Sequence, residues 1–321
     1  MAVDAAAHRV EYGRVAGLGA VVLHDDAADL HATWVPGAGM LGASLIHHGR
    51  ELLWRGRGVA AYAGRRRFMG IPFLHPWANR LGGLSYRAGG HDVVLDPASP
   101  LLLLDDVGLP IHGVLNATRR WAVREASAGA QAARLVAELD YDGAALVAVF
   151  PFPHRLRMVV EVGAGALVVS VTVTPTGDEP VPLAFGFHPY LSLPEGPPDH
   201  WQVAFPVGRQ LLHDRRLVPT GATEHVPRID GRIGAQTWDD GFDELGDPPH
   251  FEPRDGRRVV GVDFLEGFPV AQIFAPPGED HLCVEPMAAP ANALAGPDAA
   301  LEWVQPGESR TAAFRIACDL C

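Results

Sequence analysis

The sequence predicts an all-β fold, a large antiparallel sandwich or barrel, from three observations. Glycine (36 residues) and proline (28 residues) are spread along the 321-residue chain, which leaves few windows long enough for a helix. Short segments recur in which apolar and polar side chains alternate strictly, as in strands with one buried face. Turn-forming residues separate these segments at short spacing. No change in composition indicates a linker, so residues 1–321 are expected to form a single domain.

Four segments show the strand pattern most clearly. Between Leu167 and Thr174, leucine and valine alternate with serine and threonine. The other three segments are residues 155–163, 258–264 and 309–318. Glycine and proline cluster elsewhere, and the loops expected from these clusters are residues 195–200, 246–256 and 275–280.

Composition and charge restrict the classes of function. Hydrophobic residues make up 48% of the chain and charged residues 20%, which allows a large core. The formal net charge of −12 argues against nucleic acid or an anionic membrane as a partner. All 26 basic residues are arginine, so a Schiff-base lysine and a P-loop lysine are excluded. Three cysteines, no signal peptide and no apolar run of about 18 residues favour a cytoplasmic protein.

Two stretches hold the candidate catalytic residues. Residues 183–194 (LAFGFHPYLSLP) place His188 among aromatic side chains, with a proline directly after it. Residues 282–290 (LCVEPMAAP) place Glu285 in an otherwise apolar run. A lone histidine and a lone glutamate in such surroundings can form a general acid/base pair. From these residues alone, a histidine packed in the core is the more frequent case.

Four further residues are candidates for binding a polyhydroxy ligand. Arg80 follows Trp77 in residues 70–82 (GIPFLHPWANRLG), and a guanidinium beside an aromatic ring suits a sugar. The remaining candidates are His112 in IHGV, Asp239 or Asp240 in WDDGF, and Gln272 in AQIF. Each has a structural alternative: a surface arginine over a tryptophan, a turn histidine, a capping aspartate and a buried amide.

Other chemistries lack their usual motifs. The chain has no HExxH, GxSxG, GxGxxG or P-loop sequence, so no metal and no cofactor is expected. Two basic clusters, Arg65–Arg67 and Arg119–Arg120, occur in this acidic chain. Most such clusters are solvated, but either could bind a phosphate or carboxylate group.

Taken in order, the motifs resemble those of the aldose 1-epimerase (galactose mutarotase-like) family. The matching segments, from about residue 15 to residue 318, are GIPFLHPWANRL, IHGV with a downstream tryptophan, FGFHPYLSLP, WDDGF, AQIF, CVEPMAAPANAL and VQPGES. The resemblance implies a galactose mutarotase-like supersandwich, a large antiparallel β-sandwich with the sugar site in a concave groove. It also implies cofactor-free interconversion of the α and β anomers of a free aldose.

The resemblance assigns a role to each candidate residue. It implies that Glu285 is the base and His188 the acid. It implies that the substrate contacts are Arg80, His112, Asp239 and Gln272. Better-known mutarotases have Asp-His where this chain has Asp239–Asp240, and the resemblance favours Asp239.

Three alternatives remain open at the level of sequence. A hexose-6-phosphate 1-epimerase would need an arginine cluster beside the groove. A non-catalytic sugar-binding or sugar-sensing protein would need neither His188 nor Glu285 to titrate. A glycosidase or polysaccharide lyase would need a second acid, which Asp239 could supply. The expected partner is a small sugar, and the chain is expected to be a monomer or a homodimer.

Overall fold

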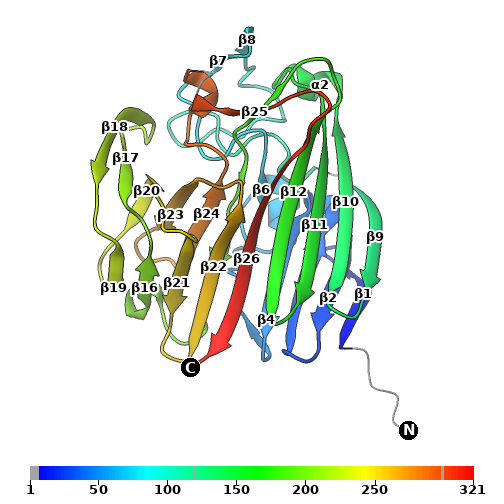
Figure 1. The fold of residues 1–321 in the computed structure, drawn as a ribbon, viewed down its shortest axis with the longest axis vertical. Helices are drawn as coiled ribbons and strands as arrows, with labels where there is room; N and C mark the ends of the chain where they lie inside the picture. Colours follow the sequence, from blue (N-terminus) through cyan, green and yellow to red (C-terminus); the bar gives the residue numbers. More distant parts are fainter. Residues whose placement is uncertain (1–6, 119, 298–299) are drawn as a thin grey trace.

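The computed structural model describes residues 7–118, 120–297 and 300–321. The structure is an antiparallel β-sandwich, as predicted. A nine-stranded sheet forms one layer, and a five-stranded and an eight-stranded sheet lie behind it (Figure 1). Among the described residues, no helix is long and apolar enough to span a membrane.

The nine-stranded sheet contains all four segments with the clearest alternating pattern. In spatial order its strands are β19 (Ile229–Arg232), β16 (Gln202–Phe205), β21 (His250–Arg254), β22 (Arg258–Glu266), β26 (Arg310–Leu320), β12 (Ala166–Pro175), β11 (His154–Gly163), β10 (Ala133–Tyr141) and β9 (Ala122–Ala128). The predicted strands correspond to β11, β12, β22 and β26, and the prediction is confirmed for each. Their alternating residues are buried on the side that faces the second layer.

The loop predicted at residues 246–256 is wrong over its central part, which forms β21. Strand β21 pairs with β16 on one side and β22 on the other. Phe251 is fully buried, and burial together with pairing on both sides outweighs the local signal of the prolines. Residues 195–200 form turns with a 3-10 helix, η2 (Pro198–His200), and residues 276–280 connect two strands as predicted.

The eight-stranded sheet carries the candidate catalytic residues. Its strands are β18 (Pro219–His225), β17 (Arg209–His213), β20 (Trp238–Asp243), β23 (Val270–Ala275), β24 (Leu282–Met287), β14 (Gly186–Phe187) and β6 (Phe73–Leu74), with β15 (Tyr190–Leu191) also paired to β24. Ile273, Val284 and Phe242 are buried on the face toward the nine-stranded sheet. Because side chains alternate along a strand, the neighbouring residues point to the opposite face.

Smaller elements complete the described fold. The five-stranded sheet runs β1 (His8–Val15), β2 (Leu18–Asp25), β3 (Leu30–Val35), β4 (Leu41–His47) and β5 (Arg50–Glu51). Two short ribbons pair β7 (Ser85–Ala88) with β8 (His91–Val94) and β13 (Val181–Leu183) with β25 (Glu302–Val304). The short helices are α1 (Val59–Arg65), α2 (Ala144–Val147), η1 (Pro36–Ala38) and η3 (Ala293–Ala295).

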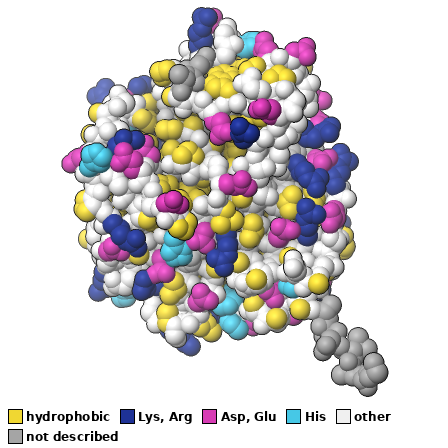
Figure 2. Space-filling view, viewed as in Figure 1, with side chains coloured by type: hydrophobic (Ala, Val, Ile, Leu, Met, Phe, Trp, Pro, Cys, Tyr) yellow, Lys and Arg dark blue, Asp and Glu magenta, His cyan; other side chains and the backbone are white. Residues whose placement is uncertain are grey.

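The principal hydrophobic core lies between the layers. Phe187 of β14 packs on Phe314 of β26, with ring centroids 5.0 Å apart. On the outer face of the nine-stranded sheet, Figure 2 shows acidic and basic side chains interspersed among apolar ones. Neighbouring strands pair these charges, for example Arg315 with Asp263 at 2.8 Å. This face is therefore a solvated surface, and the candidate site lies on the other layer.

Candidate active site

Three adjacent strands bring Glu285, Gln272 and Asp239 together. In the register of β23 and β24, Gln272 lies directly opposite Glu285. The Gln272 amide donates to Asp239 Oδ1 of β20 at 2.8 Å. All three side chains point away from the nine-stranded sheet, because their strand neighbours Ile273 and Val284 occupy the core face.

His188 meets Glu285 from the loop between β14 and β15. Its backbone N–H donates to the carbonyl of Pro72 at 3.1 Å, which fixes the start of the loop. His188 Nε2 lies 3.3 Å from Glu285 Oε1, and the two residues are only 4% and 2% exposed. The Tyr190 ring stacks on the His188 ring at 4.2 Å and 3°, and its hydroxyl lies 3.2 Å from Nε2.

Arg80 borders the site beside Asp239. Its Nη2 lies 3.6 Å from Asp239 Oδ2, while its Nε donates to Asp105 Oδ2 at 2.9 Å. Its Nη1 donates to the side-chain oxygen of Asn79 at 3.1 Å. The guanidinium therefore lies between two carboxylates, and its orientation is fixed before any ligand binds.

His112 lies in a turn whose backbone conformation places the ring beside His188. Its φ of 61° is left-handed, and its N–H donates to the carbonyl of Asn79 at 2.8 Å. The two histidine rings are 5.2 Å apart, and Phe68 packs edge-on against His112 at 5.0 Å. His112 therefore lies both in a turn and in the candidate site. The structure brings all six predicted residues together.

Burial controls the charge state of the central pair. Desolvation, reinforced by the negative charge of Asp239, raises the pKa of Glu285 well above its usual value. Desolvation, reinforced by His112 and His281, lowers the pKa of His188 well below its usual value. Desolvation, with the charge of Arg80, also lowers the pKa of His112 to about 3. Burial therefore favours the uncharged form of both groups, a protonated carboxyl and a neutral imidazole.

Sequence reasoning missed two residues of the site. Asp105 fixes Arg80, and Phe68 covers both histidines, with its ring 6.3 Å from that of His188. Neither belongs to a motif with a chemical signal, because each acts by packing or pairing across distant segments. Trp77, which the sequence places near Arg80, is only 1% exposed and belongs to the core, so it offers no exposed ring face to a sugar.

The space inside the site is small. A cavity of about 10 Å³ is lined by residues of β17, β20 and β23 together with the loops around Asn79 and Ala291. This volume holds roughly one water molecule. A sugar ring beside Asp239 and Gln272 needs more space than this cavity holds.

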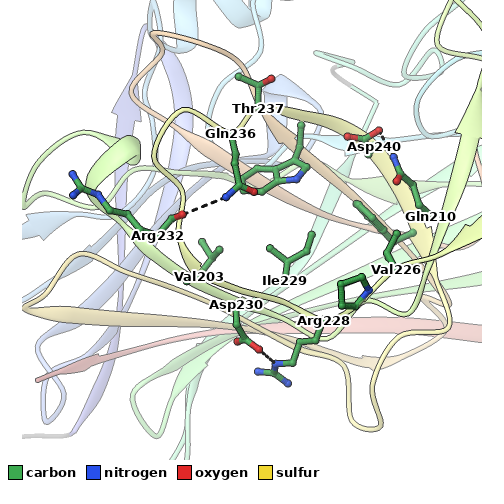
Figure 3. Close-up of a pocket in the computed structure, with 14 residues that line it drawn as sticks. Val203, Gln210, Val226, Arg228, Ile229, Asp230, Arg232, Gln236, Thr237 and Asp240 are labelled. Carbon is green, nitrogen blue, oxygen red and sulfur yellow. Dashed lines mark hydrogen bonds and ion pairs between the residues drawn. The ribbon is translucent and has the colours of Figure 1, made fainter.

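Asp240 belongs to a different cavity from Asp239. Its side chain lies on the opposite face of β20, in a cavity of about 410 Å³ between β20 and strands β16 and β19 (Figure 3). Gln210 donates to Asp240 Oδ1 at 2.7 Å, and His213 Nε2 lies 3.4 Å from the same oxygen. Of the two neighbouring carboxylates, Asp239 is the one beside Gln272 and Arg80.

Comparison with known proteins identifies structures that share this fold and a family that matches this chain. The chain is similar over its full length to the Slr1438 protein of Synechocystis sp. PCC 6803 (24% identity, 99% of each chain, TM-score 0.74). It is also similar to a galactose mutarotase-like protein of Clostridium acetobutylicum (16% identity, 98% of this chain and 99% of that one, TM-score 0.83). A galactose 1-epimerase of Lactobacillus acidophilus NCFM matches with 16% identity over 98% of each chain and a TM-score of 0.78.

At these identities the structures show that the fold is shared. No curated protein matches the chain. The family model for aldose 1-epimerase matches residues 37–317, which include all six candidate residues and most of the chain. The chain therefore belongs to the aldose 1-epimerase family.

Proposed function

We propose that this protein is an aldose 1-epimerase that interconverts the α and β anomers of a free aldose, with Glu285 as base and His188 as acid. The observation that carries the proposal is the buried contact of 3.3 Å between His188 Nε2 and Glu285 Oε1. A carboxyl group and an imidazole held this close, and shielded from water, can each exchange a proton with a hemiacetal bound against both.

The chemistry requires only proton transfers. The base removes the proton from O1 while the acid protonates the ring oxygen O5, and the C1–O5 bond breaks to give the open-chain aldehyde. Rotation about C1–C2 and reclosure with the roles reversed give the other anomer. The pair must begin with a carboxylate and an imidazolium, which carry the same total of one proton as the uncharged pair that burial favours. Transfer of that proton from Glu285 to His188 prepares the pair.

The surrounding residues favour that transfer once a sugar is bound. Sugar hydroxyls that hydrogen-bond to the Glu285 carboxylate replace the water lost on burial. Asp239, oriented by Gln272 and Arg80, is placed to accept hydrogen bonds from neighbouring sugar hydroxyls. The pKa of His112 is about 3, so this residue stays neutral and can donate or accept a hydrogen bond without adding charge.

Polarimetry on freshly dissolved α-D-glucose and α-D-galactose tests the proposal. The wild type should relax the rotation faster than the weakly buffered blank, and Glu285→Gln should lose this acceleration by roughly 10²-fold or more. Glu266→Gln is the matched control, because Glu266 is exposed and lies outside the site. An accelerated rate that persists in Glu285→Gln would rule out Glu285 as the base.

The result also separates the rival classes. If the wild type and Glu285→Gln both bind a sugar, and the wild type does not accelerate mutarotation of aldoses or of hexose 6-phosphates, the protein is a non-catalytic sugar-binding protein. Release of reducing ends from an oligosaccharide would indicate a glycosidase or lyase, with Asp239 as the second acid.

A further inference from the structure

The two arginine clusters predicted from the sequence meet at one cavity outside the candidate active site. The cavity has a volume of about 510 Å³, and Arg65, Arg66 and Arg120 line it. It shares no lining residue with the cavity at Asp239 and Gln272. Arg119, the remaining member of the second cluster, lies outside the described residues. The fold thus gathers guanidinium groups from segments more than fifty residues apart in the chain.

The positive charge of this cavity is poorly compensated. None of the residues that line it is acidic, although the chain as a whole has a net charge of −12. No described carboxylate forms an ion pair with Arg65 or Arg66, and Arg120 has only a long contact of 3.4 Å to Asp142. Arginines on the surface of an acidic protein usually form ion pairs with carboxylates, as Arg209 does with Asp243 here.

Arg66 is held in place by neutral groups. Its Nη1 donates to the carbonyls of Leu101 and Leu102 at 2.9 and 2.8 Å, and its Nη2 donates to the carbonyl of Pro100. The guanidinium is half-buried, and desolvation lowers its pKa from the ordinary arginine value. Arginine remains charged at neutral pH even so. A fixed, partly desolvated cation without a counterion attracts an anion more strongly than a mobile surface arginine does.

From this arrangement we propose that the cavity of Arg65, Arg66 and Arg120 binds a phosphate group, either free or as part of a phosphorylated sugar. Guanidinium groups match phosphate through paired charge-assisted hydrogen bonds. Thr118 and Asn116 line the same cavity, and a hydroxyl and an amide are groups that can hydrogen-bond to sugar hydroxyls. The volume exceeds what a phosphate alone would fill, so a sugar phosphate also fits.

The cavity is physically connected to the candidate active site. Asn116 donates from Nδ2 to the carbonyl of His112 at 2.6 Å. Phe68, three residues after Arg65, packs on the rings of His112 and His188. An anion that orders these two segments would therefore also order the histidines.

Binding is measured first, because it does not depend on the proposed function. Inorganic phosphate and glucose 6-phosphate are titrated calorimetrically into the wild type at constant ionic strength, with glucose as the ligand that lacks phosphate. The double variant Arg65→Gln/Arg120→Gln should bind both phosphates roughly tenfold or more weakly. Arg87→Gln/Arg228→Gln removes the same charge from exposed ion pairs elsewhere and should bind like the wild type.

Kinetics then identify the source of the phosphate, and this step rests on the proposed function. If the substrate carries the phosphate, the double variant loses roughly tenfold in kcat/KM on glucose 6-phosphate and nothing on glucose. If free phosphate is an effector, it changes the rate on glucose in the wild type but not in the double variant. Either result supports the site. Absence of phosphate binding by the wild type, or equal binding by both double variants, would overturn it, whatever the epimerase activity.

Discussion

The opposite pKa shifts of Glu285 and His188 make the stability of the protein depend on pH. Because the pKa of Glu285 is raised in the folded protein, its carboxyl stays protonated at a pH where the unfolded chain has already ionised it. The contribution of Glu285 to stability is therefore fully present below the unfolded pKa, near 4.3, and is lost as the pH rises through the raised, folded pKa. His188 has the opposite sign, because its lowered pKa reduces stability as the pH falls below about 6.5.

Glu285→Gln is accordingly expected to be inactive and yet more stable than the wild type at pH 7. The amide has no charge to desolvate, so the variant escapes the loss of stability that Glu285 causes at neutral pH. Thermal unfolding at pH 4, 5.5 and 7 measures the effect. The difference in Tm should be smallest at pH 4 and grow toward pH 7. If the variant is less stable than the wild type at pH 7, the folded protein stabilises the ionised carboxylate of Glu285, and the prediction is wrong.

Tyr190 is expected to position His188. Tyr190→Phe keeps the ring stack but removes the hydroxyl that lies 3.2 Å from Nε2. One neutral hydrogen bond is worth about 1 kcal/mol, so kcat should fall roughly fivefold with little change in KM. The matched control is Tyr86→Phe, which removes a buried hydroxyl bonded to Val149 at 2.7 Å, remote from the site. The control should lose stability but not activity; equal losses of kcat would mean that Tyr190 is merely structural.

Residues of the candidate site could be predicted from the sequence where a polar side chain has unusual neighbours in the chain. A lone carboxylate in an apolar strand and a histidine between aromatics make Glu285 and His188 candidates, and the ordered set of motifs added weight to them. The alternation of a strand shows that Asp239 and Asp240 face opposite ways, but only the assembled sheet shows which face holds the site. Asp105 and Phe68 could not be found, because their roles arise from contacts between segments distant in sequence.

At the scale of elements, tight turns place the polar residues at the ends of the strands. Gly113, directly after His112, has a φ of 67°, and a Cβ added there would lie 2.1 Å from the carbonyl oxygen of His75. Backbone atoms cannot move aside as a flexible side chain can. The turn that presents His112 therefore requires glycine at this position for two reasons, backbone conformation and space.

Gly113→Ala is expected to destabilise the protein by more than about 3 kcal/mol and to displace His112. Gly90→Ala is the control, because Gly90 also has a left-handed φ, 84°, but has open space around it. It should cost only about 1 kcal/mol, the strain of the backbone conformation. Chemical denaturation of both variants gives the comparison. Equal losses would indicate that conformation alone makes Gly113 necessary.

How well each strand could be predicted depends on whether one or both of its faces are buried. Strands β11, β12 and β26 each have one face in the core and one in solvent, so their sequences alternate. All six residues of β24 are buried, and its sequence is a continuous apolar run apart from Glu285. Strand β21 carries a proline and follows two others, and only its pairing with β16 and β22 reveals it.

At the scale of the whole molecule, the last strand of the chain occupies the middle of the largest sheet. Strand β26 lies between β22 and β12, in red near the centre of Figure 1. On either side of it are the strands of residues 122–175 and the strands of residues 202–266. The sheet is therefore continuous only when the C-terminal strand is in place, and the single domain stays a prediction.

A single domain should unfold as one cooperative unit, and β26 offers a direct test. Phe314 on this strand is fully buried against Phe187 and Phe268, and Phe314→Ala should cost about 3–5 kcal/mol. Far-UV circular dichroism reports the strands, and fluorescence reports tryptophans spread from Trp34 to Trp303. In a denaturant titration both signals should give one coincident transition, shifted by the same free energy in the variant with an unchanged slope. Transitions that did not coincide would show that the chain does not unfold as one cooperative unit.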